Sequence, residues 1–171
     1  LGAVVALGGD PERAAVALAG FRGVGRRFDR VGEVAGVAVV DDYAHHPTEL
    51  VATLAAMRQA FPTRRLVAAF QPHLFSRTAL HADAMGAALA AADVVVVADV
   101  YPAREQPLPG VTGALVADAA RRRGAEVVYQ PARRALTDTV VGILRTGDVL
   151  VTMGAGDITL LGPEVLRRLA G

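Results

Sequence analysis

Two short polar segments carry the residue types that enzymes use for chemistry. The first, D-D-Y-A-H-H-P-T-E from Asp41 to Glu49, combines two acids, a phenol and two imidazoles directly after an apolar run. The second, Q-P-H-L-F-S-R-T from Gln71 to Thr78, follows the next apolar run and supplies an imidazole, hydroxyls and a guanidinium. Because open α/β sheets bind ligands beyond the carboxyl ends of their strands, we expect both segments to line one site.

The acids and the paired histidines of the first segment allow more than one role. Asp41 and Asp42 at a strand end either bind a cation or phosphate-bound magnesium, or cap helices and solvate loops. His45 and His46 are adjacent and point in different directions, so a single metal ion cannot easily take both. We therefore predict no metal site.

The second segment offers His73 and Arg77, four residues apart at the start of a predicted helix. A guanidinium beside the free N–H groups of a helix favours a carboxylate or a phosphate. The alternative is that Arg77 pairs with an acid on the surface. His81, one helical turn beyond Arg77, is predicted to be a surface residue.

A third segment, T-M-G-A-G-D-I from Thr152 to Ile158, predicts a strand, a glycine-rich turn and a helix. Gly154 and Gly156 would let the backbone approach an anion, and Asp157 is expected to cap the helix. The glycine spacing is incomplete for a dinucleotide fingerprint. The proline-rich stretch from Tyr101 to Gly113 predicts a stiff loop over the same edge. Because the chain has no lysine, it has no lysine-bearing phosphate loop for ATP.

The elements that position these segments alternate between strand and helix after about residue 26. Apolar and β-branched runs typical of buried parallel strands occupy Val37–Val40, Leu66–Phe70, Val94–Val100, Glu126–Tyr129 and Val149–Thr152. Helical patterns lie between them, at about 47–60, 79–91, 113–123, 132–144 and 158–169. The alternation predicts an α/β fold: a doubly wound, Rossmann-like, mostly parallel sheet with helices on both faces. Arg30 to Val40 is expected to form a hairpin or an edge strand.

The first 25 residues stand outside this alternation. They predict a helix that ends at Gly8 and Gly9, followed by a second helix that runs to about Gly20. Asp10 and Pro11 are the N-cap and the first-turn proline of that second helix. We therefore divide the chain into residues 1–25 and residues 26–171.

The composition excludes several classes of protein. The net charge is +1, from 18 basic and 17 acidic residues, and the arginines are scattered, which argues against nucleic-acid binding. The absence of cysteine excludes disulfides, thiolate metal sites and a cysteine nucleophile. No signal peptide is recognisable, and no apolar run approaches the roughly 20 residues of a spanning helix. We expect a cytoplasmic protein without membrane insertion.

Four motifs, in this order and spacing, resemble one known family. They are D-D-Y-A-H-H-P-T-E, F-Q-P-H-L-F-S-R-T, D-V-Y-P-A-R-E-Q-P-L-P-G-V and T-M-G-A-G-D-I. Together they resemble the C-terminal domain of the Mur ligase family of peptidoglycan synthesis. The resemblance covers nearly the whole chain and includes G-V-G-R-R-F at the domain junction. It implies that residues 1–25 are the helical tail of the central ATPase domain plus a linker, and that residues 26–171 are the C-terminal domain.

The resemblance also implies an ATP-dependent amide ligation. In it, ATP with Mg²⁺ phosphorylates the carboxylate of UDP-N-acetylmuramate, and the amine of L-alanine attacks the acyl phosphate. The implied partners are these three substrates and the central and N-terminal domains of the same enzyme. This chain alone would hold neither ATP nor Mg²⁺ and would be inactive.

Particular residues match functional positions of the family. The L-alanine pocket is implied to contain Tyr43, His45, His73 and Arg77, with Arg77 at the alanine carboxylate. Arg27 matches an arginine that faces ATP and the acyl phosphate. Possible supporting residues are Asp42, His46, Gly154, Gly156 and Asp157. Leu74 stands where other members, with the form Q-P-H-R-Y-S-R-T, have an arginine. If that arginine shares the acceptor carboxylate, either Arg77 binds it here with less help or another arginine substitutes.

Three alternatives stay open. The recycling ligase of the same family, which attaches a tripeptide to UDP-N-acetylmuramate, shares the first motif but lacks the second. A nucleotide- or anion-binding module without catalysis is compatible with the missing phosphate loop. A metal-dependent hydrolase would use Asp41, Asp42, His45 and His73, but their spacing is poor.

Overall fold

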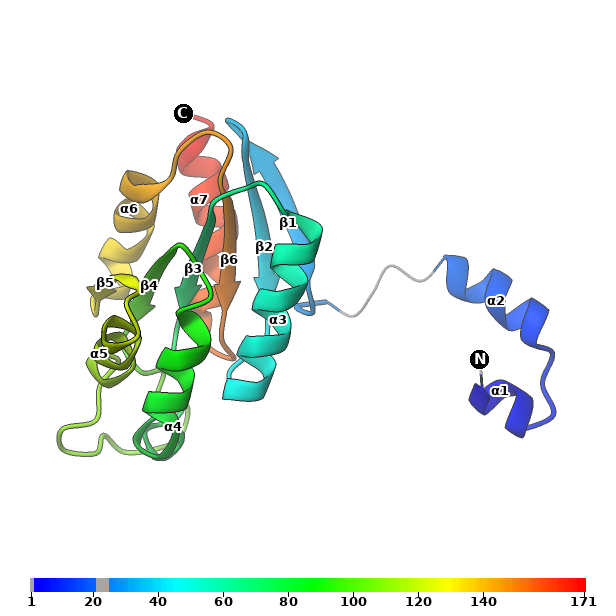
Figure 1. Ribbon diagram of the computed structural model, residues 1–171, viewed down its shortest axis with the longest axis horizontal. Helices are drawn as coiled ribbons and strands as arrows, with labels where there is room; N and C mark the ends of the chain where they lie inside the picture. The colour runs from blue at the N-terminus through cyan, green and yellow to red at the C-terminus, as the bar shows by residue number, and fades with distance from the viewer. Residues whose placement is uncertain (1, 21–24) are drawn as a thin grey trace.

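The computed structural model describes residues 2–20 and 25–171 and is built around one six-stranded sheet (Figure 1). The strands are β1 (Asp29–Val34), β2 (Val37–Asp42), β3 (Leu66–Phe70), β4 (Val94–Ala98), β5 (Glu126–Gln130) and β6 (Val149–Met153). Their spatial order is β1-β2-β6-β3-β4-β5. β1 runs antiparallel to β2, and the other neighbours are parallel. The predicted doubly wound, mostly parallel sheet is confirmed.

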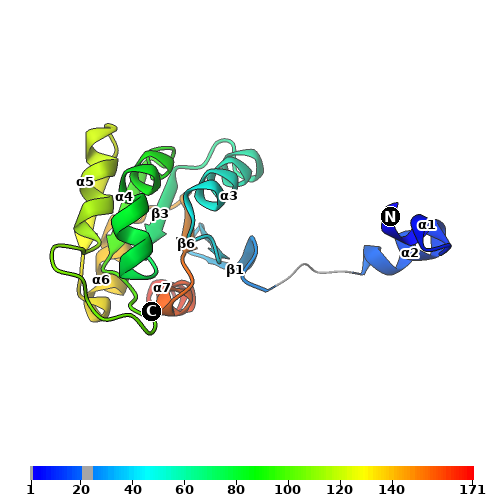
Figure 2. The same ribbon diagram turned by 90° about the horizontal axis from the view of Figure 1, so that it is seen from below.

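Helices cover both faces of the sheet. One face carries α3 (Pro47–Ala60), α4 (Phe75–Leu89) and α5 (Ala114–Arg122), and the other carries α6 (Arg133–Ile143) and α7 (Leu161–Leu169) (Figure 2). A short 3-10 helix, η1 (Asp157–Leu160), leads into α7. Because both faces are covered, β2, β3, β4 and β6 are buried along their whole length, which explains their continuous apolar sequences.

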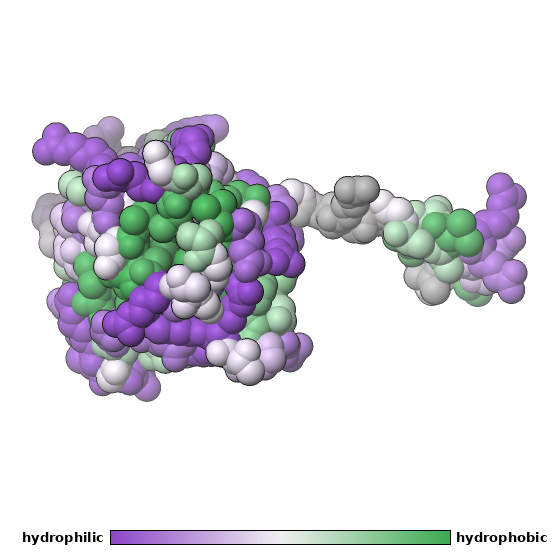
Figure 3. Space-filling model, turned by 90° about the horizontal axis from the view of Figure 1, so that it is seen from above, coloured by the Kyte–Doolittle hydropathy of each residue, from purple (hydrophilic) through white to green (hydrophobic). Residues whose placement is uncertain are grey.

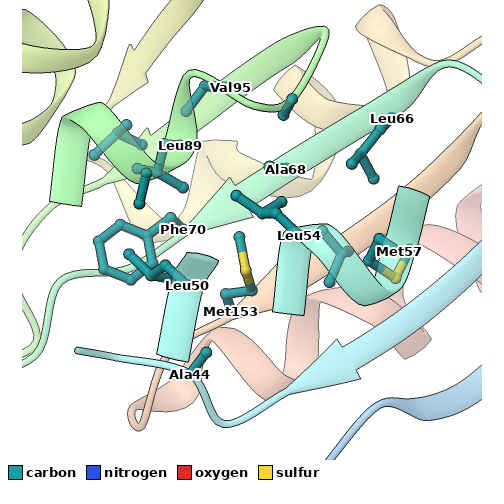
Figure 4. Packing of buried hydrophobic residues seen from close by; sticks show 14 of the residues in the cluster. Ala44, Leu50, Leu54, Met57, Leu66, Ala68, Phe70, Leu89, Val95 and Met153 are labelled. Carbon is teal, nitrogen blue, oxygen red and sulfur yellow. The ribbon is translucent and has the colours of Figure 1, made fainter. Parts of the chain in front are cut away.

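The larger core cluster lies between the sheet and α3, α4 and α5. Within it, Leu50, Leu54 and Met57 of α3 pack near Phe70 of β3 and Met153 of β6 (Figure 4). A second cluster fills the space between the sheet and α6, η1 and α7. The ends of the central strands are therefore held by packing on both sides, which fixes the loops that follow them.

Most predicted boundaries agree with the structure within two residues. The start of α4 is the largest error, because this helix begins at Phe75 and not at position 79. Phe75 and Thr78 are buried in its first turn, and Thr78 Oγ1 donates to Leu74 O at 2.8 Å. The predicted helix at 158–169 is divided into η1 and α7.

The predicted hairpin is formed by β1 and β2, with β1 at the edge of the sheet. Its turn contains Ala35 and Gly36, whose φ angles of 51° and 78° are both left-handed. Two consecutive residues with positive φ are typical of the tight turns that join antiparallel strands.

The two N-terminal helices, α1 (Gly2–Ala6) and α2 (Pro11–Ala19), have no buried residue among their described positions and lie apart from the sheet (Figure 1). Asp10 caps α2 as predicted, because its Oδ1 accepts from the backbone N–H groups of Glu12 at 2.9 Å and Arg13 at 3.3 Å. The predicted linker from Phe21 to Phe28 lies outside the described residues at positions 21–24. The division at residue 25 stays a prediction.

The surface opposite to the carboxyl ends of the parallel strands shows apolar residues surrounded by hydrophilic ones (Figure 3). No described helix combines the length and the apolar character needed to cross a bilayer. The candidate site lies at the other end, where the parallel strands finish.

Candidate functional site

The carboxyl ends of β2, β6 and β3 lie side by side. Met153 is aligned with Asp42 on one side and with Phe70 on the other. The β2–α3, β6–η1 and β3–α4 loops therefore begin at the same level of the sheet. As the sequence predicts, the two polar segments meet at one edge, together with the glycine-rich turn.

Three of the predicted pocket residues form a cluster of rings. The His45 ring centre lies 5.1 Å from that of Tyr43 and 5.9 Å from that of His73. His45 Nδ1 is 2.8 Å from Tyr43 O and 3.5 Å from Glu49 Oε2, which fixes the ring orientation. Half-buried imidazole and phenol groups thus come together from two loops.

Tyr101 completes this cluster, although the sequence predicted it only as part of a covering loop. Its ring stacks on that of His73, with 5.7 Å between centres and 12° between planes. Its backbone N–H donates to Pro72 O at 2.8 Å, and its carbonyl accepts from the Leu74 N–H at 3.0 Å. Tyr101 lies three residues beyond the end of β4, and its contact with His73 depends on the pairing of β3 with β4, which the local sequence does not show.

His73 and Arg77 each have a buried nitrogen without a partner. His73 Nδ1 and Arg77 Nη1 find no hydrogen-bond partner among the described residues. Burial lowers the pKa of His73, and the charges of Arg77 and His45 lower it further, whereas Glu105 opposes them. Near neutral pH the pair thus combines a neutral imidazole with a permanent cation, an arrangement suited to an anionic group such as a carboxylate.

Asp42 is committed to the protein itself. It is 6% exposed, and its carboxylate accepts from the backbone N–H groups of Phe28 and Ala44, both at 2.8 Å, and from Thr53 Oγ1 at 3.2 Å. Asp41 is likewise bonded to the hydroxyls of Thr152 and Thr159. Both acids are therefore buried and bonded to protein groups, so they hold loops in place and do not solvate them as the second expectation had it.

Arg27 lies at the rim of the ring cluster. Its guanidinium carbon is 5.5 Å from the Tyr43 ring centre, and its Nη1 is 3.7 Å from Glu49 Oε1. Burial raises the pKa of Glu49, but the backbone donors and charge of His45, the His46 N–H and Arg27 bring it below its usual value. The Arg27 side chain is about half exposed.

His46 belongs to a different arrangement from His45. It is the N-cap of α3, where its Nδ1 accepts from the Thr48 N–H at 3.4 Å and Glu49 Oε2 accepts from its own N–H at 3.1 Å. Its ring lies 5.1 Å from that of His81. This capping box was not predicted from the sequence.

The glycine-rich turn packs closely against the β3–α4 loop. A Cβ at Gly156 would lie 2.5 Å from both Gln71 Oε1 and Tyr101 Cγ, and one at Gly154 would lie 2.8 Å from Gln71 O. The expectation that Asp157 caps a helix is wrong. Asp157 is the first residue of η1, and its Oδ1 accepts from Gln71 Nε2 at 2.7 Å. Whether this turn also approaches an anion stays a prediction.

No group of three or more His, Asp or Glu side chains within the described ranges is arranged to hold a metal ion. The hydrolase hypothesis required Asp41, Asp42, His45 and His73 around one ion, and the two acids instead bond to protein groups. The geometry therefore gives that hypothesis no support.

Fold and site together define a doubly wound α/β domain with arginine, imidazole and phenol groups at the carboxyl edge of its sheet. Residues 26–156 match the family described as Mur ligase, glutamate ligase domain. The chain belongs to the Mur ligase family.

Individual relatives agree with this assignment. A UDP-N-acetylmuramate--L-alanine ligase of Streptomyces griseus is 52% identical over 170 residues, which are 99% of this chain and 36% of the relative. A protein of the same name from Kineococcus radiotolerans is 55% identical over 168 residues, 98% of this chain and 36% of the relative. The crystal structure of UDP-N-acetylmuramate-alanine ligase from Thermotoga maritima is 27% identical, with a TM-score of 0.78 over 98% of this chain and 35% of that one. This chain thus spans about a third of their length.

Proposed function

We propose that this chain is the C-terminal domain of an ATP-dependent ligase that joins L-alanine to UDP-N-acetylmuramate. The names of the relatives above support the reaction. Since the chain spans 36% of the length of the first of them, the proposal includes a central and an N-terminal domain that carry ATP, Mg²⁺ and most of the nucleotide-sugar contacts. Because the ligation consumes ATP, we place it in the cytoplasm.

The observation that carries the proposal is the pair of buried nitrogens without a protein partner, His73 Nδ1 and Arg77 Nη1. Buried polar groups in folded proteins nearly always have partners, so an unpaired pair at a sheet edge suits a ligand. An amino-acid carboxylate would satisfy Arg77. Tyr43, His45 and Tyr101 would then enclose the small remainder of the acceptor.

Holding the acceptor by its carboxylate leaves its amine free to attack. The amine must be neutral to act as a nucleophile. It adds to the acyl carbon to form the new C–N bond in a tetrahedral intermediate, which then loses phosphate from carbon and one proton from nitrogen to give the amide. Arg27, at the rim, is the residue of this chain that would face the phosphate charge, and the charge of the departing group is what such a cation stabilises. The chain has no lysine and so no lysine-bearing phosphate loop, and its described residues contain no group of three or more His, Asp or Glu side chains arranged to hold a metal ion.

The test is phosphate release by the full-length enzyme with ATP, Mg²⁺ and UDP-N-acetylmuramate, comparing L-alanine with the murein tripeptide. We expect alanine-dependent release, and Arg77→Ala should raise the KM for L-alanine by about 10- to 100-fold. Arg168→Ala is the matched control, because Arg168 is 64% exposed in the last turn of α7 and pairs with Asp138.

Each other result has a defined meaning. Tripeptide-dependent release would assign the protein to the recycling ligase. No release with either acceptor would favour a binding module. Ligation by the isolated 171-residue chain would contradict the expectation that the chain is inactive alone.

A further inference from the structure

Arg26 lies beside the proposed acceptor pocket, and its guanidinium joins two loops of the site edge. Its Nε lies 3.2 Å from Asp41 Oδ2, and its Nη2 donates to Gly154 O at 2.7 Å. The guanidinium carbon is also 4.8 Å from the centre of the Tyr43 ring. One side chain therefore ties the domain junction to the end of β2 and to the β6–η1 loop.

The anchor of this contact is rigid. Asp41 is 3% exposed, and its carboxylate accepts from Thr152 Oγ1 at 2.6 Å and from Thr159 Oγ1 at 2.9 Å. A buried carboxylate needs an opposite charge, and Arg26 supplies it. Asp41 thus holds Arg26 against a part of the sheet that packing has already fixed.

The backbone is held on both sides of Arg27. On one side, Arg26 O accepts from the Tyr43 N–H at 2.7 Å, and on the other, the Phe28 N–H donates to Asp42 Oδ2 at 2.8 Å. Arg26 and Phe28 have φ angles of 60° and 48°. This left-handed conformation is unfavourable for residues other than glycine and persists where the surroundings hold it. The path of residues 26–28 therefore depends on these contacts.

We propose that Arg26 is a positioning residue that holds Arg27 at the rim of the acceptor pocket. The inference rests on the function proposed above, in which Arg27 faces the phosphates. In this role Arg26 acts through Arg27: it binds Asp41 and Gly154 and so fixes the peptide from which Arg27 extends over Tyr43. Without it, Arg27 spends less time in the productive position, and the rate of the chemical step falls.

The structural half of this proposal is tested on the isolated chain by amide hydrogen exchange. Arg26→Met should speed hydrogen exchange at the Tyr43 and Phe28 amides about tenfold or more. The Tyr43 amide donates to Arg26 O, and Phe28 follows Arg27, so both amides become exposed when residues 26–28 open locally. The matched control is Arg30→Met, since Arg30 is 62% exposed and pairs only across the surface with Glu33 in the described part. Unchanged exchange at Tyr43 and Phe28 would overturn the proposal, whatever reaction the enzyme performs.

The functional half is tested by a double-mutant cycle in the full-length ligase. Arg26→Met should lower kcat about tenfold, and in an Arg27→Ala background it should add less than about twofold, because its effect acts through Arg27. Arg26→Lys, which keeps the charge at Asp41 but cannot donate in two directions as a guanidinium does, should restore part of kcat.

Fully additive effects would overturn the positioning role while leaving the proposed function intact. Failure of the proposed function is a separate result, because it shows as a wild-type enzyme without alanine-dependent phosphate release. An Arg26→Met enzyme with wild-type kcat would also refute the inference.

Discussion

Replacing Asp42 by alanine should destabilise the domain more than its place at the site edge suggests. The carboxylate accepts three hydrogen bonds, two from backbone N–H groups and one from the hydroxyl of Thr53. Ala44 and Thr53 are buried, so their donors cannot turn to water when the carboxylate is removed. Phe28 is 37% exposed, and its N–H can be partly hydrated.

The expected loss follows from these partners. An unsatisfied buried donor costs roughly 1–3 kcal/mol, so two such donors give a loss of about 3 kcal/mol once water at Phe28 is allowed for. For a domain of this size, that loss lowers Tm by roughly 6–12 °C. The Tm of Asp42→Asn should lie between those of the wild type and Asp42→Ala. The amide oxygen of asparagine can still accept a hydrogen bond, but its NH₂ group meets a donor where the second carboxylate oxygen accepted one.

The assay is thermal and urea unfolding of the isolated chain, followed by circular dichroism. Asp138→Ala is the control, since Asp138 is 71% exposed in its pair with Arg168 and exposed pairs contribute little. A decrease in Tm of Asp42→Ala no larger than that of Asp138→Ala would show that the three hydrogen bonds do not hold the loop.

Two further predictions concern the rings of the site. Gly156→Ala should cost about 1–3 kcal/mol and disturb the near-ultraviolet signal of tyrosine, because the added Cβ displaces Tyr101; Gly142→Ala, where a Cβ meets nothing within 4 Å, should not destabilise in the same urea titration. Burial and the charge of Arg77 lower the pKa of His73 below its usual value of 6.5. His73 therefore binds a proton more readily in the unfolded chain than in the folded one, so the free energy of unfolding falls as the pH decreases through the usual pKa of histidine. His73→Gln should remove the contribution of His73 to the loss of stability between about pH 7.5 and pH 5, as measured by urea titrations at both pH values. If the variant loses as much stability between these pH values as the wild type, burial does not lower the pKa of His73.

The sheet could be predicted from the sequence because its strands are buried on both faces. Continuous apolar runs such as Leu66–Phe70 then give each strand directly, and the order of motifs places the polar segments at strand ends. The pairing of β3 with β4 brings Tyr101 onto His73, a contact between residues far apart in sequence that no local pattern reveals.

The wrong or missing predictions at the site arise because the same local sequence is compatible with more than one structure. Asp157 before a helical pattern looks like an N-cap, but the 3-10 turn begins at this residue and Gln71 takes its carboxylate. His46 is a rare cap compared with Ser, Thr, Asp or Asn, so its role in α3 was not expected. No role was predicted for Arg26 in G-V-G-R-R-F, because its contacts with Asp41 and Gly154 depend on the path of the junction over the sheet edge.

The departure at Leu74 from the arginine of the family motif changes side-chain chemistry more than geometry. Leu74 has a φ of 71° and a ψ of 132°, a conformation that leucine does not favour by itself. Its N–H donates to Tyr101 O, and its carbonyl accepts from both the N–H and the hydroxyl of Thr78, so three hydrogen bonds impose this backbone whatever the side chain. The first turn of α4, and with it Arg77, is placed by those bonds. If Arg77 binds the acceptor carboxylate as proposed, it does so without a second guanidinium from residue 74. The KM of Arg77→Ala would then measure how much this one cation contributes, and a small change in KM would indicate that another arginine substitutes.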